Sequence, residues 1–221
     1  MKVLVAGASG LIGHAAIEQF QRLDGCDVVG VSRSVPDDLG AAQLLALDLT
    51  DAAACRSVLA EVTGVTHVVY AALQEGPGLL PGWYEDELIE RNGLMERNLF
   101  DALDTTAVEH VSLLQGTKAY GVHHPSIGSG AAPIPLRERA PRAEHPNFYW
   151  LQEDDLRARQ QGASWALSIF RPTVVYGTWG HHNMNPLPAI AVYAALQRAV
   201  RGEVNAWWGK KPNVTVFVHR V

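Results

Sequence analysis

Residues 3–20 read "VLVAGASGLIGHAAIEQF", which is the pattern of a short strand, a glycine-rich turn and a helix. Gly7 allows a sharp turn, Gly10 allows close approach of a pyrophosphate, and Gly13 allows the helix to pack closely on the strand. The first N–H groups of that helix would then point at the anion. A glycine triplet alone can also be purely structural, but its place on the first strand of an alternating pattern favours dinucleotide binding.

The rest of the chain alternates strand-length apolar runs with longer segments of helical period. Strands are expected near 2–6, 27–32, 43–47, 66–70, 110–114 and 165–170, and helices near 11–23, 51–61, 84–104, 147–161 and 186–201. This alternation predicts an α/β fold with a doubly wound parallel sheet, the Rossmann fold. The long irregular segment 119–146 is rich in Pro, Gly and His, and loops of that length are usually functional or mobile.

Composition narrows the class of protein. The 221 residues suit one domain with a smaller appendage, and we divide them into 1–180 and 181–221. A net charge of −5 gives no electrostatic reason to expect nucleic acid as a partner. The chain lacks a signal-like start and an apolar run of about 18 residues, so neither secretion nor a membrane span is expected. Two cysteines form no disulfide framework, which favours a reducing, cytoplasmic location.

Two histidine pairs, His123-His124 and His181-His182, raise the question of a metal site. No cysteine or carboxylate accompanies either pair at ligand spacing, so no metal is expected. A role in lining a substrate pocket is expected instead for Tyr120, His181, Asn183 and Met184.

The end of the second predicted strand, "VVGVSRSVP", bears on the choice of cofactor. An acidic residue there would accept hydrogen bonds from the adenosine ribose and favour NAD. The chain has Ser32, Arg33 and Ser34 instead, a cation and two hydroxyls suited to a 2′-phosphate. The alternative is a solvated surface arginine. We expect NADP(H).

The next two strands end in residues that suit the same ligand. "LALDLTD" places Asp48 and Leu49 where they can flank the adenine, and "VVYAAL" places the small Ala71 where it leaves room for the cofactor. Asp51 follows at a position suited to capping the next helix.

Residues 147–156, "NFYWLQEDDL", put a tyrosine just inside a predicted helix. In reductases of the Y-x-x-x-K type, a lysine follows four residues later, but here that position is Glu153. Either Tyr149 is not catalytic, or its cation comes from elsewhere in the chain.

Several stretches together answer this question: "GASGLIG", "ERNGLMERNLFDAL", "LLQGTKAYG", "NFYWLQEDDL", "SIFRPTVVYG" and "MNPLPAIAVYAAL". They resemble the extended branch of the short-chain dehydrogenase/reductase superfamily, and are most similar to the progesterone 5β-reductase and iridoid synthase-like enone reductases. The resemblance covers about residues 1–200. It implies that Lys118 supplies the cation and Tyr149 the phenol. The alternative is a solvated loop lysine and a core aromatic residue.

The resemblance also implies a cofactor site and a reaction. The expected cofactor-binding residues are Gly7, Ser9, Gly10, Leu11, Ile12, Gly13, Ser32, Arg33, Ser34, Asp48, Leu49, Ala71, Gln115, Thr117, Arg171, Pro172 and Val174. The implied reaction is the NADPH-dependent reduction of activated C=C bonds in enones or enals. The alternatives are a carbonyl reductase, a sugar-nucleotide epimerase-like enzyme, or a non-catalytic NADP-binding regulator.

Two further features concern helix packing and the end of the chain. Asn92 and Asn98 match asparagines of the family, and each either holds a water or backbone carbonyl under the site or makes plain packing contacts. The last residues, "VTVFVHRV", do not resemble the family's continuation, so most of its C-terminal substrate domain is expected to be absent. A β-rich end of this kind favours an edge strand and a homodimer through residues near 205–221.

Overall fold

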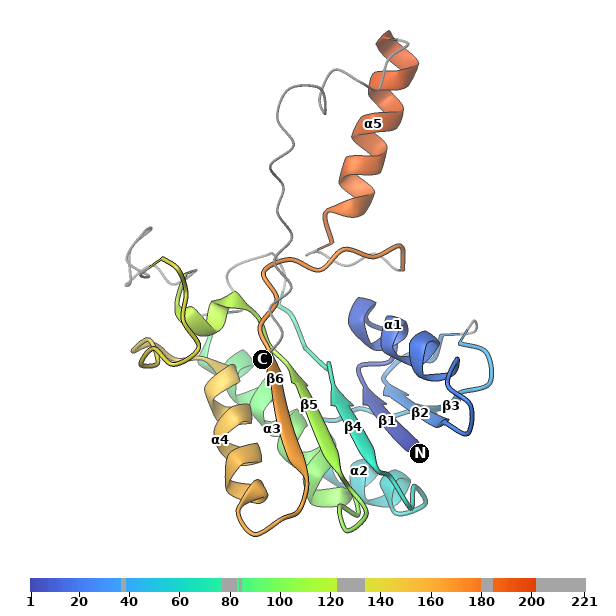
Figure 1. The fold of residues 1–221 in the computed structure, drawn as a ribbon, viewed down its shortest axis with the longest axis vertical. Helices are drawn as coiled ribbons and strands as arrows, with labels where there is room; N and C mark the ends of the chain where they lie inside the picture. Colours follow the sequence, from blue (N-terminus) through green and yellow to red (C-terminus); the bar gives the residue numbers. More distant parts are fainter. Residues whose placement is uncertain (37–38, 77–82, 84, 123–133, 180–184, 202–221) are drawn as a thin grey trace.

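The computed structural model describes residues 1–36, 39–76, 83, 85–122, 134–179 and 185–201. Its centre is a six-stranded sheet in the order β3-β2-β1-β4-β5-β6 (Figure 1). The strands are β1 (Lys2–Ala6), β2 (Asp27–Ser32), β3 (Gln43–Ala46), β4 (His67–Tyr70), β5 (His110–Leu114) and β6 (Ala166–Phe170). Every neighbouring pair is parallel, which confirms the predicted doubly wound sheet.

The predicted helices also form, each with slightly shorter bounds than expected. They are α1 (Leu11–Phe20), α2 (Ala52–Leu59), α3 (Asp86–Ala102), α4 (Phe148–Gln160) and α5 (Leu187–Arg201). A short 3₁₀ helix, η2 (Thr117–Tyr120), follows β5. Asp51 caps α2 by accepting hydrogen bonds from two backbone N–H groups, as its side chain predicts.

Helices cover both faces of the sheet. In Figure 1, α1 lies on one face and α2, α3 and α4 lie on the other. Leu4 and Val68 point into the larger core beneath α2–α4, whereas Val3 and Val5 pack with Ile17 of α1. Strand β1 is therefore buried on both faces, which explains its apolar run from Val3 to Ala6.

The strand order reverses between the neighbouring strands β1 and β4. The helices that follow them, α1 and α3, lie on opposite faces of the sheet. Open α/β sheets bind ligands at such a switch point, outside the carboxyl ends of the strands. The fold thus places the glycine-rich turn and the loops after β4, β5 and β6 around one crevice.

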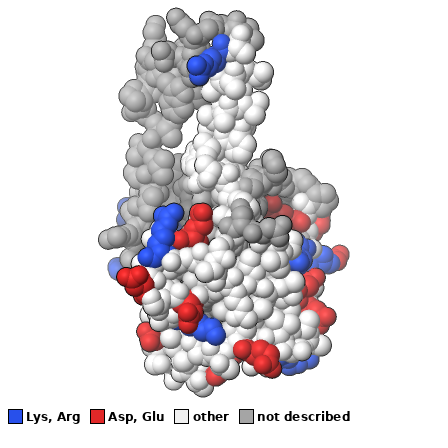
Figure 2. All heavy atoms as spheres, turned by 90° about the vertical axis from the view of Figure 1, so that its right-hand side faces the viewer, with Lys and Arg blue, Asp and Glu red and all other residues white. Residues whose placement is uncertain are grey.

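Helix α5 stands away from the sheet in Figure 1. Its side chains Val192, Tyr193 and Leu196 are 60%, 45% and 58% exposed. On the face drawn in Figure 2, basic and acidic side chains are interspersed over the body of the molecule. Among the helices of the described ranges, none is both long enough and apolar enough to cross a membrane.

Candidate active site

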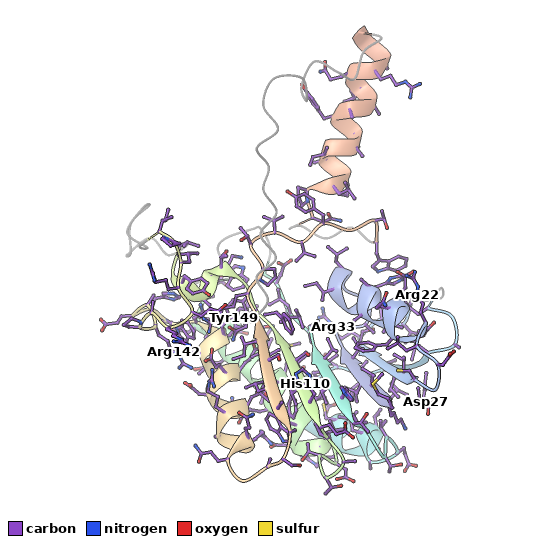
Figure 3. The ribbon with its side chains drawn as sticks, in the orientation of Figure 1. Arg22, Asp27, Arg33, His110, Arg142 and Tyr149 are labelled. Atoms are coloured by element: carbon purple, nitrogen blue, oxygen red, sulfur yellow. The ribbon has the colours of Figure 1, made fainter. Side chains whose placement is uncertain are left out.

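A cavity of about 520 Å³ opens at the carboxyl ends of the strands. Its wall contains most of the residues that the sequence predicted for the cofactor, namely Gly7, Ser9, Gly10, Leu11, Ile12, Ser32, Arg33, Asp48, Leu49, Ala71, Gln115, Thr117, Pro172 and Val174. Lys118 and Tyr149 lie in the same wall. Arg33 and Tyr149 both lie at this end of the sheet, whereas His110 lies toward the other (Figure 3).

The glycine-rich turn has the geometry that its sequence predicts. Gly7 has a φ of +88°, and a Cβ there would lie 2.7 Å from the carbonyl of Ala71. A Cβ on Gly13 would lie 2.1 Å from the Gly7 oxygen, so Gly13 packs beneath the turn and is not among the described residues of the cavity wall. The turn therefore suits the close approach of a pyrophosphate.

The segment after β6 closes against this turn. Trp179 donates a hydrogen bond from Nε1 to the Ser9 carbonyl at 3.2 Å, and its ring stacks on His14 with centroids 3.8 Å apart. Gly177 lies directly against Leu11, since a Cβ there would be 2.3 Å from the leucine side chain. These contacts were not predictable from the sequence, because they join residues more than 160 positions apart.

The ends of β2 and β3 form the part of the cavity expected to hold the adenosine. Arg33 is exposed there, whereas the Ser32 hydroxyl turns to the Ser34 carbonyl. Hydrogen bonds from the backbone and side chain of Thr50 lower the pKa of Asp48, and the charge of Arg33 lowers it further. Ser34 is not among the described residues of the cavity wall.

The two asparagines of α3 hold loops of the cavity. Asn98 donates a hydrogen bond to the Leu49 carbonyl at 2.8 Å. Asn92 accepts from the Gln74 N–H at 2.8 Å and donates to its carbonyl at 2.9 Å. Of the two roles left open by the sequence, the structure supports the holding of backbone groups beneath the site.

Lys118 is a partly buried residue of the cavity wall, and its ammonium nitrogen is buried. Its Nζ lies 3.4 Å from the centroid of the Trp83 ring and has no hydrogen-bond partner among the described residues. Burial lowers the pKa of Lys118 to about 8, although the charge of Glu75 opposes this shift. A cation held by a ring face keeps its donors available for an incoming oxygen.

Tyr149 is buried among aromatic rings. It packs edge-on against Trp83 with centroids 5.5 Å apart, and burial raises the pKa of its hydroxyl above the usual value. A Cβ on Gly116 would lie 3.2 Å from that hydroxyl. The phenol therefore stays protonated near neutral pH, and its hydroxyl lies close to the backbone of Gly116.

Asn147 joins the two predicted catalytic residues. Its Oδ1 accepts a hydrogen bond from the Tyr149 N–H at 3.0 Å, which caps α4. Its Nδ2 donates to the Lys118 carbonyl at 3.1 Å. One side chain thus fixes the loop of the lysine to the first turn of the tyrosine's helix.

Some predicted residues lie elsewhere. Arg171 is not among the described residues of the cavity wall; it pairs with Glu153 at 2.7 Å. Its guanidinium lies 5.3 Å from the ring of Tyr120, which is also not among those residues. The predicted pocket residues His181, Asn183 and Met184 lie outside the described residues. Within the described part of the chain, no group of three or more His, Cys, Asp or Glu could hold a metal ion.

The sequence analysis missed several residues of the cavity wall, among them Glu75, Trp83 and Gly116. Gly116 could have been found, because it lies inside the "QGTKAYG" stretch that carries Lys118. Trp83 offered no signal, since its contacts with Lys118 and Tyr149 arise only on folding.

A Rossmann sheet, a glycine-rich turn at its switch point and a lysine–tyrosine pair in the same cavity define a nicotinamide dinucleotide-binding protein of the short-chain dehydrogenase/reductase type. The family model of the NAD dependent epimerase/dehydratase family matches residues 3–219. The chain belongs to this family, in the extended branch of the superfamily.

Curated relatives match most of the chain. It is 31% identical over 205 residues to 3-oxo-Delta(4,5)-steroid 5-beta-reductase from Arabidopsis thaliana, covering 87% of this chain and 51% of the relative. It is 30% identical over 206 residues to (S)-8-oxocitronellyl enol synthase from Camptotheca acuminata, with shares of 87% and 51%. The chain thus spans about half the length of the curated relatives that it matches.

Solved structures share the fold. A UDP-glucose 4-epimerase superposes with a TM-score of 0.70 at 20% identity, covering 90% of this chain and 61% of the other. The Thermus thermophilus UDP-glucose 4-epimerase in complex with NAD gives a TM-score of 0.65 at 22% identity, with shares of 88% and 61%.

Proposed function

We propose that the protein reduces activated C=C bonds of α,β-unsaturated carbonyl compounds with NADPH. The observation that carries the proposal is the ammonium of Lys118, which lies in the same cavity wall as Tyr149 and has no hydrogen-bond partner among the described residues. The names of the relatives support it, since one is a steroid 5-beta-reductase and another an enol synthase.

The residues of the cavity fit a dinucleotide. Gly7 and Gly10, which lie in the cavity wall, would receive the pyrophosphate, and Arg33 would pair with a 2′-phosphate. Leu49, held by Asn98, and the small Ala71 would flank the adenine half. Pro172 and Val174 would lie beside the nicotinamide half.

The chemistry of the pair follows from charge. The bound cofactor would supply a hydride to the β-carbon of the substrate, and negative charge would then develop on the carbonyl oxygen. Lys118 and Tyr149 would each donate a hydrogen bond to that oxygen, and donors aimed at developing charge lower the barrier. The α-carbon of the enolate then takes up a proton from solvent, which completes the saturated carbonyl compound.

Carbonyl reduction and epimerisation are less well supported by the site. Exchange between an alcohol and a ketone needs a proton relay at the tyrosine, and the usual lysine of that relay is replaced by Glu153. A non-catalytic NADP-binding regulator would leave the buried lysine–tyrosine pair without a role.

Incubation of the protein with NADPH and 2-cyclohexenone, followed by product analysis, tests the proposal. The expected product is cyclohexanone. Formation of the allylic alcohol would show carbonyl reduction instead, and NADPH binding without consumption would favour the regulator.

A further inference from the structure

Glu153 lies four residues after Tyr149, where reductases of the Y-x-x-x-K type carry a lysine, and its side chain is buried. Its side chain is only 7% exposed, and Oε2 accepts a hydrogen bond from Arg171 at 2.7 Å. A buried carboxylate is costly unless it is paired and hydrogen-bonded. Arg171, whose side chain is 16% exposed, satisfies this need from the end of β6.

Arg171 is also connected, through Gln115, to the active-site tyrosine. Its Nε donates a hydrogen bond to Oε1 of Gln115 at 3.0 Å. Gln115 in turn donates from Nε2 to the carbonyl of Tyr149 at 3.0 Å. These hydrogen bonds therefore link Glu153 to Tyr149, which both lie in α4, through Arg171 after β6 and Gln115 after β5.

Two further arginines reach the other carboxylate oxygen from the outside. Arg157 lies 2.9 Å and Arg142 3.4 Å from Oε1 of Glu153, and their side chains are 56% and 38% exposed. Ion pairs of such exposed groups contribute little. The Arg171 pair is the buried one, and it alone of these three continues to Gln115 in the described structure.

We infer that Glu153 is a positioning residue for Tyr149. By holding Arg171, and through it the Gln115 amide, it fixes the first turn of α4 against the ends of β5 and β6. A lysine at position 153 would set its ammonium against the guanidinium of Arg171, so the cation of the site must come from elsewhere. The expected effect of Glu153 on turnover rests on the proposed function.

The first test compares Glu153→Gln with Arg157→Ala as a matched control. The amide keeps the shape of Glu153 but loses the charge that holds Arg171. Small misplacements of a reacting group are costly, so kcat should fall about tenfold while the NADPH Kd changes less than about twofold. The control should keep the wild-type kcat. Equal kcat values for both variants would overturn the inference.

A second arm separates positioning from general stability. In a Tyr149→Phe background, Glu153→Gln should cause no further loss of kcat, because the group that Glu153 positions is gone. If Glu153→Gln lowers kcat by the same factor in both backgrounds, the residue acts on the whole fold and the inference is wrong.

A third experiment monitors the environment of Tyr149 by NMR and does not depend on catalysis. In protein labelled with ¹³C in its tyrosine rings, the Tyr149 signal is assigned by its loss in Tyr149→Phe. Glu153→Gln should shift this signal, and Arg157→Ala should leave it in place. Arg171→Lys should shift it as well, because an ammonium cannot replace the planar fork that joins Glu153 to Gln115. An unmoved signal in Glu153→Gln or in Arg171→Lys would overturn the inference. A shifted signal in a protein that does not reduce enones would support the positioning and reject the proposed function.

Discussion

At the level of single residues, substitution of Arg33 tests whether the protein prefers NADPH to NADH. It is exposed in the cavity wall at the end of β2, where it would pair with a 2′-phosphate. Loss of a charge-assisted hydrogen bond costs roughly 1.5–3 kcal/mol, so Arg33→Ala should erase about tenfold or more of a preference for NADPH over NADH. Titration of both nucleotides into wild type and variant measures this. Equal affinities of the wild type for both would contradict the assignment.

Lys118 should give turnover a dependence on pH. Burial lowers its pKa to about 8, so the ammonium is present below that pH and is lost as pH rises through it. kcat should therefore fall above about pH 8. Lys118→Arg, whose guanidinium stays protonated, should lack this alkaline limb in whatever activity it retains. A limb at the same pH in this variant would assign the titration to another group.

Single residues also show what sequence can and cannot predict about a site. Gly7 and Gly13 were predictable, because the turn leaves no room for a side chain at either position. The need for glycine is therefore visible in the sequence pattern itself. Lys118 could be assigned only through resemblance, since nothing in its neighbours places it in the cavity. Trp83 was not predictable, because its contact with Lys118 joins residues 35 positions apart that no sequence pattern connects.

At the level of helices and strands, the packing of α3 against α4 buries a carboxyl group. Glu96 of α3 is fully buried, and burial, together with the charge of Asp155 of α4, raises its pKa to about 9. The folded protein therefore holds a proton that the unfolded chain releases near pH 4.5. Stability should fall as pH rises from about 4.5 to about 9, because the unfolded state binds fewer protons in that range.

Glu96→Gln removes this proton linkage and keeps the shape of the side chain. At pH 8 the variant should be more stable than wild type, by an amount on the order of 4 kcal/mol. At pH 5 the two proteins should be nearly equal. Thermal melts at both pH values measure the difference, and a variant that is less stable at pH 8 would show that the carboxylate is ionised in the fold.

Element bounds followed from the sequence with small errors of known origin. The helix expected at 147–161 is Phe148–Gln160, since Asn147 caps it from outside the helix. The strands of β1 and β2 were found at their predicted bounds, because buried parallel strands form continuous apolar runs. The placement of α5 was not predictable, because helical period does not show what a helix packs against.

At the scale of the whole molecule, α5 bears on assembly. Its exposed Val192, Tyr193 and Leu196 form an apolar surface, and such surfaces often mark protein contacts. We propose that the chain forms a homodimer that uses this helix, whereas the sequence pointed to residues near 205–221, which lie outside the described residues. Sedimentation should give a dimer, and Leu196→Glu should shift it toward monomer. A monomeric wild type at tens of micromolar would refute this.

We propose that Tyr149 and Lys118 together stabilise one developing oxyanion in this cavity. The most direct test measures turnover of NADPH with 2-cyclohexenone for wild type, Tyr149→Phe, Lys118→Ala and the double variant. Loss of one such donor costs about 10²–10³ in kcat, and Tyr149→Phe should show a loss of that order with NADPH affinity little changed. The double variant should lose less than the product of the single losses, because both groups serve one oxygen. Full enone reduction by Tyr149→Phe would contradict the account.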